Sequence, residues 1–459
     1  MNNLQLALVT ASRYNILPLT STCNLSCVFC SHRQNPPGVE TRPLPPLKSE
    51  EVNTLLDYLD GNRKIVIGES ATRLTEGEPL THPDFLAILH KVRRRFPRTQ
   101  VELTTNGTRL TREMVAALAS LGPLEINLSL NSASPEGRRR LMREQNPVIA
   151  LQAPRALQEA GIPYHGSLVA CPWLVGWQDI RETILYLSQS GARTIRVFLP
   201  GYTRLAPPEL RFPPNLRQRL ERELEELRTR TSVPLLLEPP CLGDLAPIVE
   251  GVIRDSAAAA AGMQQGDLVL EVDGRRPRCR VEAYRLAAAP GRRRLLIGRR
   301  RVKNNSDGKE VALPPVAGDG WQTSFLELQV GEEGSGLTFT WDFDPDLLPE
   351  VEKACRRHAG RAVVLTSALA ARVVGKALAG LPDLEVVAAP NHFFGGSIGC
   401  AGLLTLADFQ DAWQEWQGNN GPADLIILPS IAFDYRGRDL RGEHYLKLAE
   451  VSNTPVELV

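Results

Sequence analysis

Residues 100–132 read QVELTTNGTRLTREMVAALASLGPLEINLSLNS, and this stretch decides the fold class. Two runs rich in β-branched and apolar residues, at 100–107 and 124–132, predict strands, and the segment between them has the apolar spacing of a helix. Two strands joined by a helix are parallel, because the chain must cross back over the sheet before the second strand begins. The stretch therefore predicts one β-α-β unit of a wound sheet or barrel.

The same alternation of strands and helices extends from about residue 50 to residue 230. Four further strands are predicted, at 64–68, 72–75, 164–171 and 194–200. Helical stretches lie between most of them, and several end at a glycine. A parallel α/β architecture follows, and in such folds the catalytic residues gather at the carboxyl ends of the strands.

The composition is that of a globular protein with two to four domains: 459 residues, a formal net charge of +1 and 43% hydrophobic residues. The balanced charge gives no indication of an obligatory nucleic acid or anionic membrane partner. One basic cluster, at 292–294 and 299–301, is interpreted as a solvated strand edge or turn rather than a phosphate site. Because the N-terminal residues lack a signal-peptide pattern and no apolar run reaches the roughly 20 residues that span a bilayer, we expect a cytoplasmic protein.

Changes in composition along the chain predict the domain boundaries. A charged helical stretch followed by the proline-rich LEPPCLGDLAP ends the first α/β domain, which we place at 1–235. A small, mostly β module is predicted at 236–302, a linker at 303–320 and a second α/β domain at 321–459.

Cys23, Cys27 and Cys30 lie within eight residues of one another, and the other five cysteines of the chain are scattered. In a reducing compartment such a trio indicates a metal or redox site rather than disulfides. Three thiolates leave one position of a tetrahedral site open, either for a functional ligand or for a fourth protein ligand. His32, two residues after Cys30, is the candidate fourth ligand of a structural zinc ion.

The spacing CxxxCxxC, with Phe29 before the last cysteine, resembles the motif of the radical S-adenosylmethionine (SAM) enzymes. The resemblance covers about residues 14 to 205 and implies a partial (β/α)6 barrel. It also implies that the three cysteines hold a [4Fe–4S] cluster whose open iron binds SAM. In this superfamily the cluster passes one electron to SAM, and the resulting 5′-deoxyadenosyl radical abstracts a hydrogen atom from the substrate.

Three further segments follow in the order of that superfamily. EGEPLTHPDF (76–85) resembles the Gly-Gly-Glu-Pro segment that receives the SAM ammonium, although Glu76 stands where the superfamily usually has its first glycine. TTNGT (104–108) and INLSLNS (126–132) resemble the ends of the third and fourth barrel strands. The resemblance assigns these residues to SAM binding: Gly77, Glu78, Pro79, Asn106, Ser129 and Asn131.

Two single residues are further candidates, Cys171 at the end of the fifth predicted strand and Arg196 on the sixth. Cys171 would face the radical as a hydrogen donor or thiyl radical, and the alternative is a buried structural thiol. Arg196 would contact SAM or a substrate carboxylate if it points into the barrel, but alternate residues of a strand point to opposite faces.

The middle of the chain, PIVEGVIRDSAAAAAGMQQGDLVLEVDGRR, resembles a bacterial PDZ domain, a fold that usually captures peptide C-termini. DLAPIVE stands in place of the usual Gly-Leu-Gly-Phe pattern, and its Pro247 lacks an N–H donor. A spacer role is therefore the alternative to peptide binding.

The stretch 388–409 resembles a C-terminal domain of unknown function that accompanies PDZ and radical SAM modules in largely uncharacterised proteins. The matching positions are Asn391, Phe393, Phe394, Gly395 and Gly402. We expect this stretch to bind substrate or cofactor by stacking on a flat ligand or packing against the barrel rim, and the alternative is an internal turn. A related tail in a radical SAM arginine methyltransferase works with cobalamin, so cobalamin is an alternative cofactor, although the familiar Asp-x-His-x-x-Gly motif is absent.

These features predict a radical SAM enzyme that modifies an unidentified protein or peptide. Two alternatives stand beside it: a cobalamin-dependent radical SAM methyltransferase, and a non-catalytic metal-binding scaffold built around the PDZ-like module. The expected partners are a low-potential electron donor such as ferredoxin or flavodoxin and a protein or peptide substrate.

Overall fold

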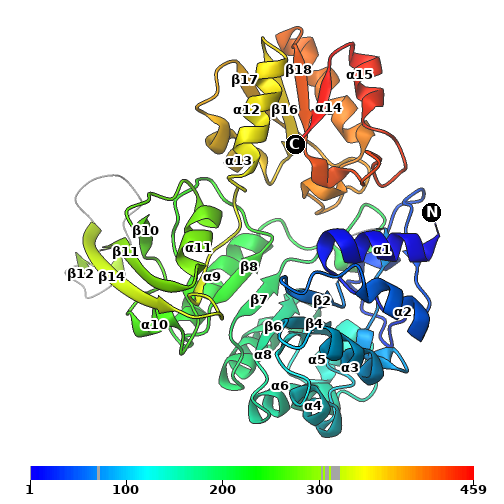
Figure 1. Cartoon of the computed structure of the whole chain (residues 1–459), viewed down its shortest axis with the longest axis vertical. Helices are drawn as coiled ribbons and strands as arrows, with labels where there is room; N and C mark the ends of the chain where they lie inside the picture. The colour runs from blue at the N-terminus through cyan, green and yellow to red at the C-terminus, as the bar shows by residue number, and fades with distance from the viewer. Residues whose placement is uncertain (1, 70–72, 301–302, 305–309, 312–320) are drawn as a thin grey trace.

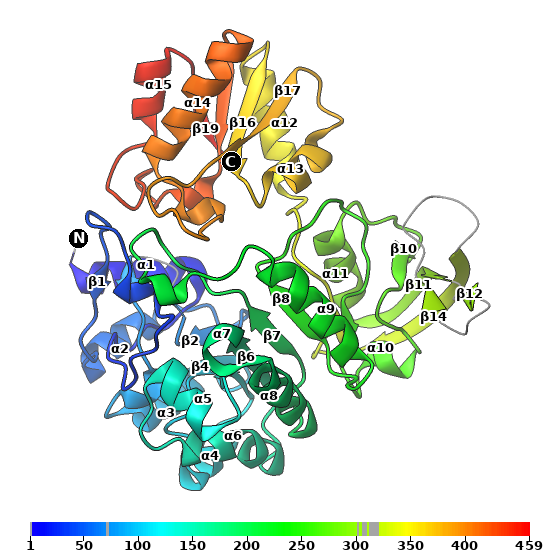
Figure 2. The same ribbon diagram turned by 180° about the vertical axis from the view of Figure 1, so that it is seen from behind.

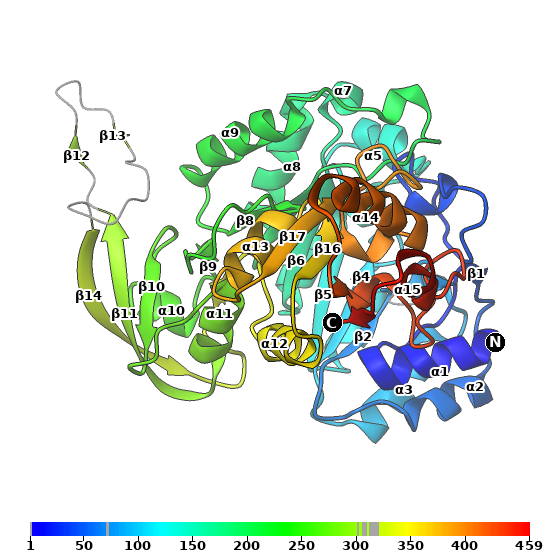
Figure 3. The same cartoon turned by 90° about the horizontal axis from the view of Figure 1, so that it is seen from above.

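The computed structural model describes residues 2–69, 73–300, 303–304, 310–311 and 321–459. Figure 1 shows an α/β half-barrel, a small mostly β unit and a C-terminal α/β domain. Figure 2 shows the same parts from behind, and Figure 3 shows the small unit extending to one side of the other two. In the described part of the chain, no helix combines the length and the apolar character needed to cross a membrane.

The half-barrel is a six-stranded parallel sheet in the order β2-β4-β5-β6-β7-β8, so the predicted partial barrel is confirmed. Its strands are β2 (Ile65–Ile67), β4 (Val101–Thr105), β5 (Leu124–Ser129), β6 (Tyr164–Val169), β7 (Ile195–Phe198) and β8 (Leu235–Glu238). The helices that surround the sheet are α1 (Asn3–Tyr14), α2 (Ser49–Leu56), α3 (Phe85–Arg95), α4 (Arg112–Ala119), α6 (Val148–Glu159), α8 (Trp177–Gln189) and α9 (Leu216–Arg228). Two short helices, α5 (Pro135–Met142) and α7 (Pro172–Val175), follow the carboxyl ends of β5 and β6.

The strands alternate between an apolar outer face and a polar inner face. Along β5, Leu124, Ile126 and Leu128 are buried in the core that the helices share. The residues between them point to the opposite face, where the Asn127 amide donates to the Thr104 hydroxyl of β4 at 3.4 Å. Burial of the apolar face holds the helices on the sheet, and the inner face is left with polar groups that suit a polar ligand.

Two sequence-based expectations for this sheet are corrected. The strand predicted at 72–75 lies outside the sheet, because β3 (Leu74–Thr75) pairs only with β1 (Arg42–Pro43), and residues 70–72 are not among those described. The sixth strand is β8, whose short run between two prolines gave little signal in the sequence. The half-barrel therefore extends past the boundary expected at 235.

The small unit has a three-stranded antiparallel sheet in the order β10-β11-β14. Its elements are β9 (Gly251–Val252), α10 (Ala257–Ala260), β10 (Leu268–Val272), α11 (Arg280–Ala288), β11 (Gly291–Arg300), β14 (Trp321–Val330) and β15 (Leu337–Thr338). Because β14 pairs with β11 and β15 pairs with β9, residues 321–338 belong here and not to the C-terminal domain. Within the expected linker at 303–320, the described residues form β12 (Lys303–Asn304) and β13 (Glu310–Val311).

The basic cluster of the sequence lies on β11, which is the central strand of this sheet, so the expected strand edge is wrong. Three of its arginines form ion pairs: Arg292 with Glu327, Arg293 with Asp273, and Arg299 with Asp267. Because these arginines pair with carboxylates of the protein, the pairs support a structural role for the cluster rather than a phosphate site. Arg301 lies outside the described residues.

The C-terminal domain is the predicted α/β unit, a parallel sheet in the order β17-β16-β18-β19. Its elements are α12 (Leu347–Arg357), β16 (Ala362–Ser367), α13 (Ala371–Leu378), β17 (Leu384–Ala389), α14 (Leu406–Asn420), β18 (Leu425–Leu428), α15 (Leu446–Ser452) and β19 (Val456–Leu458). The strand β16 is buried along its whole length, because helices cover both faces of the sheet.

Arg138 of α5 is a fully buried charge at the carboxyl end of the half-barrel. Its guanidinium pairs with the buried Glu144 and donates to the backbone carbonyls of Leu130 and, at 3.1 Å, Asn106. One side chain thus ties the segments that follow β4 and β5. Removing one partner of a buried ion pair leaves the other charge without compensation.

We predict that Arg138→Met destabilises the half-barrel by about 3–5 kcal/mol, because Glu144 and two carbonyls lose their donor in a buried site. Thermal and urea unfolding of the metal-free protein measure the change. The matched control is Arg139→Met on the same helix, where an exposed pair with Glu136 at 3.6 Å contributes only about 0.5 kcal/mol. Equal stability of the two variants would contradict the role assigned to Arg138.

Candidate functional site

The cysteine loop (residues 20–34) lies at the carboxyl end of the parallel sheet. The segment before it runs beside β2, where the Leu17 amide donates to the Val66 carbonyl at 2.8 Å. The end of α5 holds the middle of the loop, because the Val28 amide donates to the Leu141 carbonyl at 2.8 Å. The three cysteines are therefore presented where parallel α/β folds place their catalytic groups.

All three thiols of the loop are free; Cys23 is exposed, and Cys27 and Cys30 are half-buried. Burial, followed by the charges of the neighbouring Cys23 and Cys30, raises the pKa of Cys27 to about 12. Although the Cys23 residue is exposed, partial desolvation by the surrounding protein raises the pKa of its thiol as well. A metal that binds here must therefore displace thiol protons, since the thiolate is the ligand.

The three cysteines lie on one short loop, and their thiols are the candidate metal ligands. Among the described residues, no three His, Cys, Asp or Glu side chains converge on a single metal position. The zinc site with His32 stays the alternative to a cube in which each thiolate binds a different iron.

Gly77 brings the 76–85 segment into direct backbone contact with the cysteine loop. Its amide donates to the Thr20 carbonyl at 2.9 Å, and the Glu78 amide donates to the Thr22 carbonyl at 2.8 Å. A Cβ at position 77 would lie 2.2 Å from the Thr22 carbonyl oxygen, so only glycine fits. Pro79 is buried at the start of the short 3-10 helix η2 (Pro79–Thr81) that follows.

The carboxylate of Glu78 is buried and satisfied by the protein, with 3% of the residue exposed. One oxygen accepts hydrogen bonds from the Thr105 hydroxyl at 2.7 Å and the Leu80 amide at 3.2 Å. The other accepts from the Asn106 amide at 2.7 Å. Burial raises the pKa of Glu78, and these hydrogen bonds oppose that shift. Thr105 was not identified from the sequence; its position at the end of β4 was the available signal.

Asn106 links the end of β4 to the cysteine loop. Its side-chain amide donates to the Asn24 side chain at 3.1 Å and lies 4.0 Å from the Cys23 sulfur. Its side-chain oxygen Oδ1 accepts from the Thr108 hydroxyl at 2.7 Å. The assigned residues Gly77, Glu78 and Asn106 thus form one connected group beside the cysteines.

Ser129 and Asn131 lie together at the end of β5 but have different surroundings. Asn131 is buried at φ +62°, where its side chain accepts from the Val169 amide at 2.9 Å and donates to the Ser129 carbonyl at 3.2 Å. The Ser129 hydroxyl lies on the inner face, 3.4 Å from the Ser167 hydroxyl of β6. Asn131 therefore stabilises the strand exit, while Ser129 faces the interior of the half-barrel.

Comparison with known families agrees with this geometry, because the profile of the radical SAM superfamily matches residues 17–187. Residues 17–187 are a radical SAM domain. The profile of a PDZ domain matches residues 248–301, within the small unit. Members of the superfamily carry a [4Fe–4S] cluster and SAM, and three thiols on one loop at the carboxyl end of the sheet fit that cluster.

Relatives found by sequence match part of the chain. GTP 3′,8-cyclase of Streptomyces coelicolor is 32% identical over 158 residues, which are 34% of this chain and 44% of that protein. GTP 3′,8-cyclase of Aquifex aeolicus is 33% identical over 126 residues, which are 28% and 37% of the two chains. This chain therefore spans less than half the length of these relatives.

Solved structures resemble part of the chain. SuiB of Streptococcus suis, in a crystal structure with its precursor peptide SuiA, is 16% identical with a TM-score of 0.37, and the match covers 50% of this chain and 51% of that one. The structure titled native anSMEcpe with bound AdoMet is 15% identical with a TM-score of 0.35, covering 49% and 62%.

In this radical SAM domain, Glu76 is a buried carboxyl group with an unsatisfied oxygen. Its Oε1 is shielded from solvent and has no hydrogen-bond partner among the described residues. Burial, and to a lesser extent the charge of Glu69, raises the pKa of Glu76 to about 8. The residue that departs from the superfamily pattern is thus held as a neutral acid at pH 7.

The two single candidates of the sequence analysis have different surroundings. Cys171 is fully buried after β6, beside Leu141 and Met142, and burial raises the pKa of its thiol to about 12. Arg196 points to the inner face of the half-barrel, 3.6 Å from Glu238 of β8. Arg196 is therefore available to a ligand in the barrel, whereas Cys171 packs beneath the cysteine loop.

The C-terminal domain contacts the radical SAM domain through the 391–398 loop. The Arg204 amide, after β7, donates to the Phe394 carbonyl at 2.7 Å, and the Ser397 amide donates to the Tyr202 carbonyl at 2.9 Å. Gly396 has φ +64°, and a Cβ there would lie 2.1 Å from the Tyr202 carbonyl oxygen. The loop packs against the barrel rim, which was one of the two expected modes.

Within that loop, the assigned residues make internal contacts as well. Asn391 accepts from the Phe394 amide at 2.9 Å and donates to the Leu403 carbonyl at 2.7 Å. Phe394 is buried against Phe393 in an edge-to-face pair with centroids 5.0 Å apart. Gly395 adopts φ +61° next to Arg204. These contacts shape the loop that meets the barrel.

A second contact joins the two domains. Arg73 pairs with Glu40 and with Asp434 of the C-terminal domain, and it donates to the Asp439 carbonyl at 2.6 Å. A cavity of about 770 Å³ lies between α1 and this part of the C-terminal domain, and its described lining includes Gly402 but none of the residues 391–395. The carboxyl ends of both parallel sheets therefore face each other.

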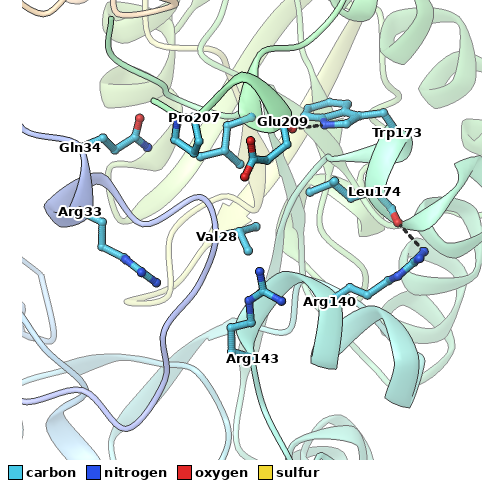
Figure 4. Close-up of a pocket in the computed structure, with 10 residues that line it drawn as sticks. Val28, Arg33, Gln34, Arg140, Arg143, Trp173, Leu174, Pro207 and Glu209 are labelled. Atoms are coloured by element: carbon cyan, nitrogen blue, oxygen red, sulfur yellow. Dashed lines mark hydrogen bonds between the residues drawn. The ribbon is translucent and has the colours of Figure 1, made fainter. Parts of the chain in front are cut away.

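Another cavity, of about 540 Å³, lies against the cysteine loop (Figure 4). We call it the basic pocket, and it is lined by Val28, Arg33, Gln34, Arg140, Arg143, Trp173, Leu174, Pro207, Glu209 and Leu210. Arg140 donates to the Leu174 carbonyl at 2.8 Å, and the Trp173 indole donates to the Glu209 carbonyl at 2.7 Å. Its walls thus come from the cysteine loop and from the segments that follow β5, β6 and β7.

We predict that Glu76→Gln makes the metal-free protein more stable than the parent at pH 8 and above, and nearly equal to it at pH 4.5. Between the ordinary pKa of a glutamate and about 8, the folded protein keeps a proton that the unfolded chain has lost. The parent therefore loses stability as pH rises through that window, by on the order of 1.4 kcal/mol per pH unit.

Thermal unfolding of both proteins between pH 4.5 and 9 measures this difference. Glu136→Gln, at an exposed carboxylate of α5, is the matched control and should follow the parent at every pH. Parallel curves for Glu76→Gln and the parent would show that Glu76 is not held as a neutral acid.

We predict that Gly396→Ala loosens the contact between the C-terminal domain and the barrel rim, because its Cβ would overlap the Tyr202 carbonyl and the backbone conformation disfavours alanine. Hydrogen–deuterium exchange should rise by at least about fivefold in residues 200–204 and 391–398, corresponding to a loss of about 1 kcal/mol. Gly418→Ala, in a helix with open space around it, is the control. Unchanged exchange in Gly396→Ala would contradict this interface.

Proposed function

We propose that this chain is a radical SAM enzyme that holds one [4Fe–4S] cluster on Cys23, Cys27 and Cys30 and modifies a protein or peptide. The observation that carries the proposal is the placement of three free thiols on one loop at the carboxyl end of a parallel half-barrel. When bound, the cluster would supply one electron for the reductive cleavage of SAM to a 5′-deoxyadenosyl radical, which abstracts hydrogen from the substrate.

The residues of the chain have distinct roles in this proposal. Because Gly77 has no side chain, its backbone lies close to the cysteine loop. A Cβ at this position would push the two backbone segments apart. Asn106 orients the loop through Asn24 and lies against Cys23. Ser129 and Arg196 present a hydroxyl and a cation on the inner face, suited to the ribose and carboxylate of SAM or to a polar substrate group.

A protein or peptide substrate is supported by the PDZ domain, because this fold recognises extended chain ends by β-augmentation. It is also supported by the rim contacts of the C-terminal domain, which bring a second domain over the mouth of the half-barrel. A radical reaction requires exclusion of water and stray hydrogen donors, and an open half-barrel depends on such a cover. The free state of all eight cysteines accords with a reducing compartment, so we propose the cytoplasm.

We predict about four irons per chain after anaerobic reconstitution with iron and sulfide, the content of one cube. Cys27→Ala should lose most of this iron and its visible absorbance, because one corner of the cluster has no ligand. Cys241→Ala, at an exposed cysteine outside the loop, should retain both. Stoichiometric zinc in place of iron would instead support a metal-binding scaffold.

The activity itself is tested by assaying 5′-deoxyadenosine after the reconstituted protein is mixed with SAM and dithionite. Formation of 5′-deoxyadenosine by the parent and its loss in Cys27→Ala are the expected results. Addition of a peptide pool should stimulate the reaction, and stimulation by GTP alone would favour a nucleotide substrate. An intact cluster that never cleaves SAM would overturn the proposal.

A further inference from the structure

The basic pocket lies against the cysteine loop. Val28 lines it, and this residue lies between Cys27 and Cys30 in the chain. The inner-face residues Ser129 and Arg196 do not line it. A molecule seated in this pocket would therefore contact the loop between two of its cysteines.

The pocket carries unpaired positive charge. Among the residues that the structure describes, no carboxylate forms an ion pair with Arg33 or Arg143, and both arginines are exposed. Arg140 has a partner in Glu136 at 3.4 Å, but both side chains are solvent-exposed, so this pair neutralises little of the charge. Glu209 is the acidic residue of the lining. The face around Val28 is therefore net positive.

Arg143 is one of the pocket's two exposed cations without an ion-pair partner among the described residues. It ends α5 in the left-handed conformation, at φ +59°, and its guanidinium is directed toward Val28 in Figure 4. Arg33, on the other side of the loop, is held by hydrogen bonds to the Ser26 hydroxyl at 2.6 Å and carbonyl at 3.3 Å. Two cations thus flank the cysteine loop.

We propose that the basic pocket and its rim are the docking surface for an acidic one-electron carrier protein, which reduces the cluster through the cysteine loop. This inference rests on the proposed function. One electron would leave the reduced carrier and enter the cluster, so that the carrier is oxidised by one electron and the cluster is reduced by one. Charge complementarity of this kind steers association and suits a small, transient redox interface.

The positive charge of the pocket and its position beside the cysteine loop favour an acidic electron carrier as the partner. Electron transfer requires close approach of the two redox centres, and the pocket offers such an approach because Val28, between Cys27 and Cys30, lines it. The C-terminal domain contacts the rim at residues 200–204 and at Arg73, and none of these residues lines the basic pocket. The surface is therefore open to a second protein while the barrel mouth is covered.

The test measures how fast photoreduced flavodoxin reduces the cluster-loaded protein, by stopped-flow absorbance at low and at high ionic strength. Arg143→Glu should slow the second-order rate on the order of tenfold at low salt, with a smaller difference at high salt. Arg143→Lys keeps the charge and should stay close to the parent. Visible absorbance and reduction by dithionite establish that each variant holds an intact cluster.

Arg94→Glu is the matched control. Arg94 is exposed in the last turn of α3, which ends a few residues before β4 begins, so it lies at the amino end of the sheet, opposite the cysteine loop. This variant should react with flavodoxin like the parent. Equal slowing by Arg94→Glu and Arg143→Glu would reveal a general charge effect and overturn the docking surface.

Three other outcomes also decide against the proposal. If Arg143→Glu reacts normally with flavodoxin but loses substrate-stimulated 5′-deoxyadenosine formation with dithionite as reductant, the pocket is an anion-binding part of the substrate site. If the parent takes up no iron–sulfur cluster, the proposed function fails and the docking surface fails with it. A parent that cleaves SAM with dithionite, together with an Arg143→Glu variant of unchanged flavodoxin rate, defeats the docking surface alone.

Discussion

The buried carboxylate of Glu78 is the interaction on which the site depends. Its two oxygens accept hydrogen bonds from the hydroxyl of Thr105 and the amides of Leu80 and Asn106. Burying a carboxylate away from water costs free energy unless hydrogen-bond donors compensate for the lost solvation. With these donors, the Glu78 carboxylate joins the 76–85 segment to the end of β4. Asn106 continues the connection to the cysteine loop, so the position of Cys23 follows from a network that begins at Glu78.

The same network explains why the loop needs so little regular structure of its own. The backbone of Gly77 lies against the Thr20–Thr22 carbonyls, and Arg138 ties the segments after β4 and β5 from the other side. The cysteine loop is therefore held by hydrogen bonds to neighbouring strand exits. The residues that hold it contribute to metal binding by positioning the thiols, and the soft thiolates provide the ligands.

The two α/β domains meet with the carboxyl ends of their sheets facing each other. Loops that follow β7 and β17 make this contact, and loops at strand ends are where parallel folds carry their functional groups. The glycine at 396 permits the close approach of two backbones that the interface requires. The half-barrel thus receives from another domain the cover that its own six strands do not provide.

The sequence by itself determined the half-barrel, the cysteine trio and the order of the segments beside it, because these features depend on local patterns: periodic apolar residues, turn residues and the spacing of ligands. It did not identify β8, the place of β14 in the small unit, the buried role of Arg138 or the basic pocket. Each of these depends on pairing between segments far apart in the chain, which local propensity does not encode. The surroundings of Glu76 show the same limit: its place in the motif was visible in the sequence, but only the tertiary structure decided that its carboxyl group is buried without a partner, because burial is a property of the packed neighbours.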